Sequence, residues 1–187
     1  MDDLKGNMEE VISIWREADA VCFDVDSTVI QEEGIDELAK FCGKGPEVQA
    51  MTKNAMGGGI GFREALTARL NIIQPTMTQI RDFIRFCPPR LTPGIKKLVD
   101  CLHQRSIPVY LVSGGFRGLI GPVALDLNIP LQNIYANKLK FFLNASRKGT
   151  PLLKGLFSST VSSCLVHKGI PTGLHSDILY LSSTLLM

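Results

Sequence analysis

The chain has 187 residues, 45% of them hydrophobic, which suffices for one domain with a sizeable core. A formal net charge of +2, without any run of lysine or arginine, excludes the basic footprint of nucleic-acid-binding proteins. The polar first residues are unlike a secretory signal, and no apolar stretch is long enough to cross a bilayer, so we expect a cytoplasmic protein without a membrane partner. Five scattered cysteines favour free thiols over disulfides or a zinc site.

The first predicted elements are a short amphipathic helix over 8–18 and a buried strand over Val21–Val25. The strand is brief, apolar and without polar alternation, as expected for a strand covered on both faces. From residue 31 to about 90 the residue spacing predicts helices, and so long a helical insert after a strand is typical of a cap or lid. Glycine and proline interrupt this insert at 43–46, 57–61 and 75.

A second helix–strand alternation follows the insert. Thr92 is the expected N-cap of a helix with Pro93 in its first position, and a strand is predicted over Pro108–Val112. The next helix contains Gly121-Pro122, which should kink or split it, and residues 133–143 read as a further strand. This order predicts a parallel α/β sheet with helices on both faces.

Two carboxylates at the end of the first strand carry the strongest functional signal. Asp24 and Asp26 are spaced by one residue, so an extended chain projects both to the same side. Ligands of parallel sheets bind at the carboxyl ends of strands, where Ser113 and Gly114 are also predicted to lie. A carboxylate can attack phosphorus, a second acid can transfer protons, and carboxylates can hold Mg²⁺ beside a phosphate. The hydroxyl of Thr28 or Ser113 can donate to phosphate oxygens, and so can backbone N–H groups in glycine-rich turns.

The segment from Phe23 to Val29 resembles the first motif of the haloacid-dehalogenase-like phosphatases. Within that family, four longer segments resemble the phosphoserine phosphatases. They are VCFDVDSTVIQEEGIDELAKFCG, MTKNAMGGGIGFREALTARLNIIQP, LTPGIKKLVDCL and VYLVSGGFRGLI. The likeness runs in register from about Ala18 to Phe142, some two-thirds of the chain.

The resemblance implies a Rossmann-like parallel sheet, here with an incomplete core, and a helical cap inserted after the first strand. The core would comprise 18–30 and 91–143, and the cap 31–90. Residues 144–187 would form a divergent tail of uncertain fold. The implied reaction is Mg²⁺-dependent hydrolysis of O-phospho-L-serine to L-serine and phosphate through an aspartyl-phosphate, the last step of serine biosynthesis, with a homodimer as a possible assembly.

Site roles follow from the same resemblance. Asp24 matches the nucleophile and a Mg²⁺ ligand, and Asp26 matches the general acid/base, with its main-chain carbonyl also on the metal. Glu33 matches the acid that faces the substrate amine, and Arg69 the group that binds its carboxylate. The remaining matches are substrate-binding positions: Met56, Gly57, Ser113, Gly114 and Gly115. Taken without the resemblance, Glu33 and Arg69 read as ordinary surface residues.

The likeness ends after Phe142. The third motif of the family, a lysine, and its fourth, G-D-G-x-x-D after a buried strand, are not recognisable here. Beyond Lys154 the charged residues are Lys168 and Asp177, a composition unlike the rest of the chain. The alternative is therefore a catalytically impaired variant that binds substrate or another subunit. The missing strand would also leave Val21–Val25 as an exposed edge, for which Ile178–Leu181 is a candidate cover without support from its flanks.

Overall fold

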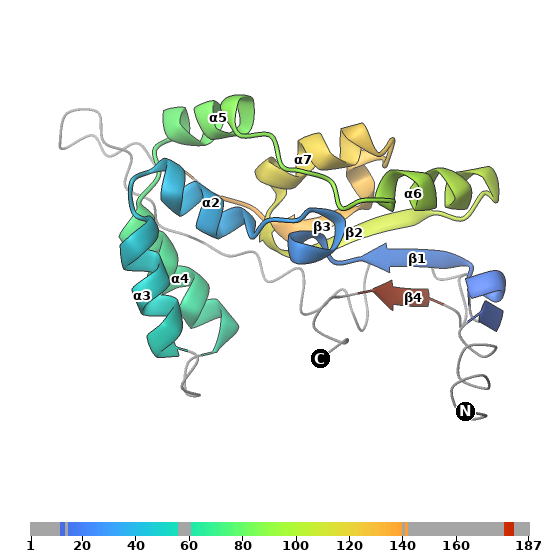
Figure 1. The fold of residues 1–187 in the computed structure, drawn as a ribbon, viewed down its shortest axis with the longest axis horizontal. Coiled ribbons are helices and arrows are strands. Elements are labelled where there is room, and N and C mark those ends of the chain that lie inside the picture. The colour runs from blue at the N-terminus through green and yellow to red at the C-terminus, as the bar shows by residue number, and fades with distance from the viewer. Residues whose placement is uncertain (1–11, 14, 56–60, 140, 142–177, 182–187) are drawn as a thin grey trace.

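A computed structural model of the chain describes residues 12–13, 15–55, 61–139, 141 and 178–181. Its centre is a parallel sheet of four strands in the order β3-β2-β1-β4 (Figure 1). The strands are β1 (Ala20–Phe23), β2 (Val109–Phe116), β3 (Ile134–Asn137) and β4 (Ile178–Leu181). The predicted α/β class with a parallel sheet is confirmed, and the helical residues among 12–17 agree with the predicted first helix.

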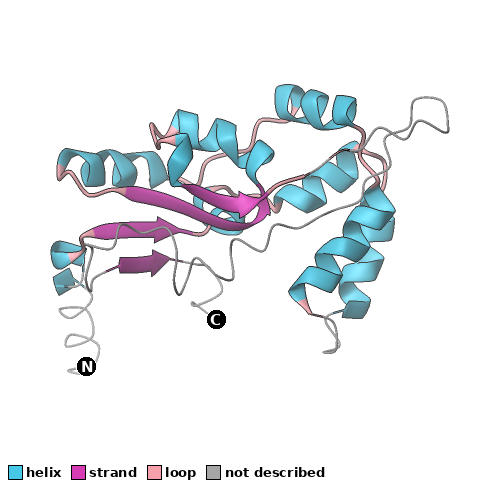
Figure 2. Cartoon of the chain, turned by 180° about the vertical axis from the view of Figure 1, so that it is seen from behind, coloured by secondary structure: helices cyan, strands magenta, loops and turns pink. Residues whose placement is uncertain are grey.

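Helices α6 (Ile95–Gln104) and α7 (Arg117–Asp126) lie on the same face of the sheet (Figures 1 and 2). Each is the crossover between neighbouring parallel strands, and two right-handed crossovers that step in one direction place their helices on one face. Coverage of the second face by helices remains a prediction, because it depends on residues outside the described part of the chain.

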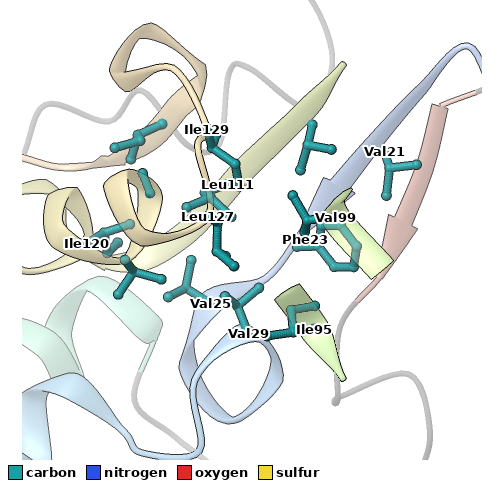
Figure 3. Packing of buried hydrophobic residues seen from close by; sticks show 14 of the residues in the cluster. Val21, Phe23, Val25, Val29, Ile95, Val99, Leu111, Ile120, Leu127 and Ile129 are labelled. Atoms are coloured by element: carbon teal, nitrogen blue, oxygen red, sulfur yellow. The ribbon is translucent and has the colours of Figure 1, made fainter. Parts of the chain in front are cut away.

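The main hydrophobic core fills the space between this face of the sheet and the two helices. Figure 3 shows Val21 and Phe23 of β1 packed among side chains from α6, β2 and α7. Val21 and Phe23 share this face because every second side chain of a strand points to the same side. Other fully buried members of the cluster include Val25, Val29, Val99, Leu111, Ala124 and Leu127.

The described residues between Gly34 and Phe86 form the α-helices α2 (Gly34–Phe41), α3 (Gly45–Ala55), α4 (Phe62–Ile73) and α5 (Met77–Phe86). They meet around a second cluster that includes Leu38, Val48, Ile73 and Phe83. The predicted breaks at 43–46 and at Pro75 lie at helix ends, while residues 56–60 are outside the described part. Thr76 begins α5 with a capping box, in which its hydroxyl accepts from the Gln79 N–H at 3.1 Å.

The two ends of this insert are joined side by side. The Gln31 N–H donates to the Arg90 carbonyl at 3.0 Å, and the Thr92 N–H donates to the Val29 carbonyl at 2.9 Å. The Arg90 guanidinium also pairs with Glu32 at 2.5 Å. The insert therefore leaves and re-enters the core at one point, which places its helices over one edge of the sheet.

The strand that covers the free edge of β1 comes from the far end of the chain. β4 pairs with β1 in parallel, with Ala20 opposite Ile178 and Phe23 opposite Leu181. The candidate named from the sequence therefore provides the cover, so the described residues of β1 have a backbone neighbour on both sides. The residues that flank this segment do not predict a strand, so the position of β4 is determined by its pairing with β1.

Several sequence predictions of element boundaries are wrong. The N-cap of α6 is Gly94 with φ 88°, not Thr92, because Thr92, Pro93 and Gly94 form a turn in which the Ile95 N–H donates to the Thr92 carbonyl at 3.1 Å. Proline followed by a glycine of positive φ favours such a turn over a helix start. Helix α7 continues through Pro122 as one helix, so the predicted split is wrong, whereas the alternative of a kink at Pro122 stays a prediction.

The other differences concern strand length. β2 ends at Phe116 instead of Val112. β3 ends at Asn137 instead of running through 133–143, and β1 ends at Phe23 instead of Val25. Both strands stop at polar side chains with hydrogen bonds outside the regular ladder: Asp24 accepts from the adjacent Val25 N–H, and Asn137 donates to the Gly114 carbonyl of β2. Among the described residues, no helix has the length and hydropathy that would let it span a membrane.

We predict that Leu111→Ala lowers the free energy of unfolding by about 2–5 kcal/mol, because Leu111 is 0% exposed in the core and its truncation leaves a cavity. Leu125→Ala is the matched control, since Leu125 is 63% exposed and should change stability by less than about 0.5 kcal/mol. Urea denaturation of the two variants measures both values. Equal losses would contradict the placement of the core.

Candidate active site

The turn that follows β1 brings both predicted carboxylates to the carboxyl edge of the sheet. This turn, η1 (Val25–Val29), closes with the Ile30 N–H on the Val25 carbonyl at 3.0 Å, and the Asp24 carboxylate accepts from the Val25 N–H at 2.8 Å. Ser27 has φ 53°, a conformation that non-glycine residues seldom adopt. Asp24 and Asp26 are each half-buried as a result.

The Asp26 carboxylate connects three separate parts of the chain. Its Oδ1 accepts from the Gly34 N–H at 2.7 Å, and its Oδ2 accepts from the Ser113 hydroxyl at 3.2 Å. Gly34 is the first residue of α2, where backbone N–H groups are unpaired and the helix dipole favours a negative charge. The first strand, the insert and the second strand therefore meet at one side chain.

Ser113, Gly114 and Gly115 lie where the sequence predicts them, at the carboxyl end of β2. Ser113 is 2% exposed, and its Oγ accepts from the Gly115 N–H at 2.8 Å. A Cβ on Gly115 would lie 3.1 Å from the Ser113 hydroxyl and 3.2 Å from Asp26 Oδ2. A side chain here would crowd the Asp26–Ser113 pair, so glycine suits the close approach of the backbone to this pair.

Glu33 faces the same carboxylates. Its Oε1 accepts from the Ser27 hydroxyl at 2.6 Å. The residue as a whole is exposed, yet protein atoms crowd its carboxyl group. Removal from solvent raises the pKa of Glu33 above its ordinary value, repulsion from Asp26, Asp36 and Asp24 adds to the rise, and the Ser27 hydrogen bond opposes it. An ammonium group near Glu33 would relieve this repulsion.

Helix α4 presents Phe62 and Arg69 on one face. Positions 62, 66, 69, 70 and 73 share that face at helical spacing, and Leu66 and Leu70 pack against Phe116 beside the glycines. The Phe62 ring lies so close to Gly114 that a Cβ there would be 2.3 Å from its Cζ. The Arg69 Nε is buried and has no hydrogen-bond partner. A buried donor of this kind is costly unless an acceptor reaches it, which fits a carboxylate-binding role.

The predicted substrate contacts Met56 and Gly57 lie outside the described residues. The structure thus brings together Asp24, Asp26, Glu33 and the Ser113–Gly115 loop, with α4 above that loop.

Asp24 and Asp26 are the described residues suited to hold Mg²⁺. Within the described part of the chain, no three histidine, cysteine, aspartate or glutamate side chains gather as a metal site. Mg²⁺ commonly uses one or two protein carboxylates together with water and phosphate oxygens, so the chemistry of this pair fits the ion.

A cavity of about 110 Å³ lies between the insert and the core, against Asp26 and Gly115. Its walls are mainly apolar and include Ile35, Phe83 and Ile120. Because neither Asp24 nor Ser113 lines it, we do not assign the substrate to this cavity.

The sequence prediction missed four contributors: Ser27, Gly34, Phe62 and Asn137. Asn137 donates through Nδ2 to the Gly114 carbonyl at 2.8 Å. Asn137 ends β3 and is followed by Lys138, so its polarity alone did not mark it as part of the site. Ser27 and Gly34 act through local backbone geometry, and Phe62 acts through tertiary contact, for which the sequence contains no such signal.

We predict that Glu33→Gln raises the free energy of unfolding at pH 7 and that the gain disappears near pH 3. A carboxyl whose pKa is raised on folding is disfavoured as the anion in the folded state, so it lowers stability once the pH exceeds that pKa. Urea denaturation across this pH range measures the effect. Glu32→Gln is the comparison, and it should lower the free energy of unfolding at pH 7. Burial tends to raise the pKa of Glu32, but hydrogen bonds and the charge of Arg90 outweigh it and lower the pKa, so the anion stabilises the fold. Identical pH profiles would contradict this assignment.

Comparison with known proteins agrees with this geometry. The haloacid dehalogenase-like hydrolase family matches residues 18–171. The phosphoserine phosphatase of Bos taurus is 54% identical over 140 residues, which cover 75% of this chain and 62% of that protein. The chain thus spans under two-thirds of the length of this relative.

Two solved structures share the fold. A phosphoserine phosphohydrolase-like protein of Francisella tularensis is 37% identical with a TM-score of 0.55, over 67% of this chain and 60% of that one. The structure named DsGPDH of Dunaliella salina is 38% identical with a TM-score of 0.67, over 77% of this chain and 25% of that one. The family match covers most of the chain and includes the residues of the site. This chain belongs to the haloacid dehalogenase-like hydrolase family.

Proposed function

We propose that this chain hydrolyses O-phospho-L-serine to L-serine and inorganic phosphate in a Mg²⁺-dependent reaction. The observation that carries the proposal is the pairing of Asp24 and Asp26 at the end of β1 with the Ser113 loop at the end of β2. The names of the relatives support the substrate, because the bovine protein is a phosphoserine phosphatase.

The proposed reaction has two steps. The Asp24 carboxylate attacks phosphorus, an O–P bond to Asp24 forms, and the bond from phosphorus to the serine oxygen breaks while Asp26 supplies the proton to that oxygen. Asp26 then takes a proton from a water molecule that cleaves the aspartyl-phosphate and regenerates Asp24. Mg²⁺ held by Asp24 and Asp26 would reduce the repulsion between the carboxylates and the phosphate.

The Ser113–Gly115 loop and the helical insert would bind different parts of the substrate. The Ser113 hydroxyl and the backbone of Gly114 and Gly115 would hold phosphate oxygens. Glu33 would bind the ammonium group, since its carboxyl is partly removed from solvent and lies near Asp26, Asp36 and Asp24. The buried Nε of Arg69 would donate to the substrate carboxylate. Another small phosphate ester would leave these two charged groups without partners, which favours an amino-acid phosphate.

The wider assignments are part of the same proposal. Residues 18–30 and 91–143 would form the catalytic core, 31–90 a cap that contributes Met56 and Gly57 to the substrate site, and 144–187 a divergent tail. The protein would act in the cytoplasm in serine biosynthesis and could assemble as a homodimer.

A second candidate is a chain that binds phosphoserine without turnover. It is favoured by the absence of a recognisable motif lysine and G-D-G-x-x-D loop, and by a match to 62% of the bovine relative. Loss of one stabiliser of transition-state charge typically slows an enzyme by about 10²–10³.

We therefore predict phosphate release from O-phospho-L-serine that requires Mg²⁺ and is slower than that of an intact relative by about 10²–10³. Asp24→Asn should lower this rate by at least about 10³, because the amide is not a nucleophile but keeps the shape of the side chain. A colorimetric phosphate assay follows both proteins. Turnover that survives Asp24→Asn would refute the proposed nucleophile.

Calorimetry with O-phospho-L-serine separates the second candidate from the first. We expect Arg69→Ala to weaken binding by about tenfold or more, because it removes a charge-assisted contact. Arg63→Ala, on the exposed side of the same helix, is the matched control. Binding heat without phosphate release would identify a binding protein, and equal affinities of the two variants would refute the role of Arg69.

A further inference from the structure

The carboxyl end of β2 contains two residues that have no partner in the neighbouring strand. Along β3 the register advances by one residue, from Ala136 to Asn137, while along β2 it advances from Ser113 to Phe116. Gly114 and Gly115 therefore bulge out of the ladder, which leaves backbone groups without their usual partners. Asn137, 6% exposed at the end of β3, compensates by donating from Nδ2 to the Gly114 carbonyl at 2.8 Å.

This hydrogen bond also controls the opposite side of the same peptide. The Gly114 carbonyl and the Gly115 N–H belong to one planar trans peptide and point in opposite directions. With its carbonyl held by Asn137, the peptide directs its N–H to the Ser113 Oγ at 2.8 Å. That oxygen accepts from Gly115, and the single hydroxyl hydrogen donates to Asp26 Oδ2 at 3.2 Å, since a carboxylate can only accept. A continuous series of hydrogen bonds thus runs from β3 to Asp26.

We propose that Asn137 is a positioning residue, which fixes the Gly114–Gly115 peptide and thereby aims the Ser113 hydroxyl between Asp26 and the phosphate. The phosphate part of this inference rests on the proposed function, whereas the control of the peptide does not. In a purely structural role, Asn137 would tie β3 to β2 and support the fold without affecting the loop.

The chain offers a matched control for that distinction. Asn133, the residue before β3, donates from Nδ2 to the Val109 carbonyl at 2.9 Å. The contact has the same chemistry and nearly the same length, and it joins the same two segments. It lies at the amino end of β2, away from Asp26, so Asn133→Ala removes an equivalent strand tie and leaves the loop untouched.

The first test compares amide hydrogen exchange at Gly115 in ¹⁵N-labelled Asn137→Ala and Asn133→Ala, with the melting temperature of each recorded. We expect exchange at Gly115 to accelerate by about tenfold or more in Asn137→Ala and to stay near the wild-type rate in Asn133→Ala. Equal acceleration in the two variants would overturn the inference, because it would show a general loss of stability. If Asn137→Ala does not fold, Asn137→Ser, which retains a hydroxyl donor, takes its place, with Asn133→Ser as its matched control. We then expect a smaller acceleration at Gly115 in Asn137→Ser and a rate near that of the wild type in Asn133→Ser.

The second test titrates inorganic phosphate into the same proteins and measures affinity by ³¹P NMR. We expect Asn137→Ala to bind phosphate about tenfold more weakly than wild type and Asn133→Ala to bind it equally well. Equal affinity of all three proteins would overturn the positioning of Ser113 toward phosphate. A wild-type chain that binds no phosphate would contradict the proposed function, while the exchange comparison would still decide whether Asn137 controls the peptide.

Discussion

The Asp26 carboxylate is the contact on which the rest of the site depends. Its two hydrogen bonds, to the Gly34 N–H and the Ser113 hydroxyl, join the start of the insert to the end of β2. An acid in this place needs donors because a half-buried carboxylate without them would be unfavourable. The same donors set the distance between the insert and the sheet, so the position of the insert and the geometry of the site have one origin.

The backbone around this carboxylate is shaped for close approach. A side chain at Gly115 would crowd Ser113 and Asp26, and one at Gly114 would require the Phe62 ring to move. Regular pairing with β3 is interrupted at this end of β2, and the Asn137 side chain supplies one hydrogen bond there. Glu33 adds a further local penalty, because it places a third carboxylate near Asp24 and Asp26. Concentrated like charge and irregular backbone are typical of sites that bind a ligand rather than of structural corners.

The sequence was informative wherever a local pattern had a local cause. An apolar strand that ends in Asp24 and Asp26, and a second that ends in Ser113, predicted which residues would meet, because parallel strands share a carboxyl edge. The start of α6 was misplaced because Pro93 and Gly94 suit a turn as well as a helix start. The role of Asn137 was missed because it depends on a two-residue bulge in a different strand. The pairing of β4 with β1 joins residues far apart in the chain, so the sequence could name the segment but not decide the contact.

The central claim is that Asp24 forms a covalent bond to phosphorus in a site assembled by Asp26 and Ser113. Rapid acid quenching of the protein during reaction with O-phospho-L-serine and Mg²⁺, followed by peptide mass spectrometry, tests it directly. The account predicts a phosphate adduct on Asp24 that appears during turnover and disappears when substrate is exhausted. Phosphate release without an adduct, or an adduct on another residue, would contradict it.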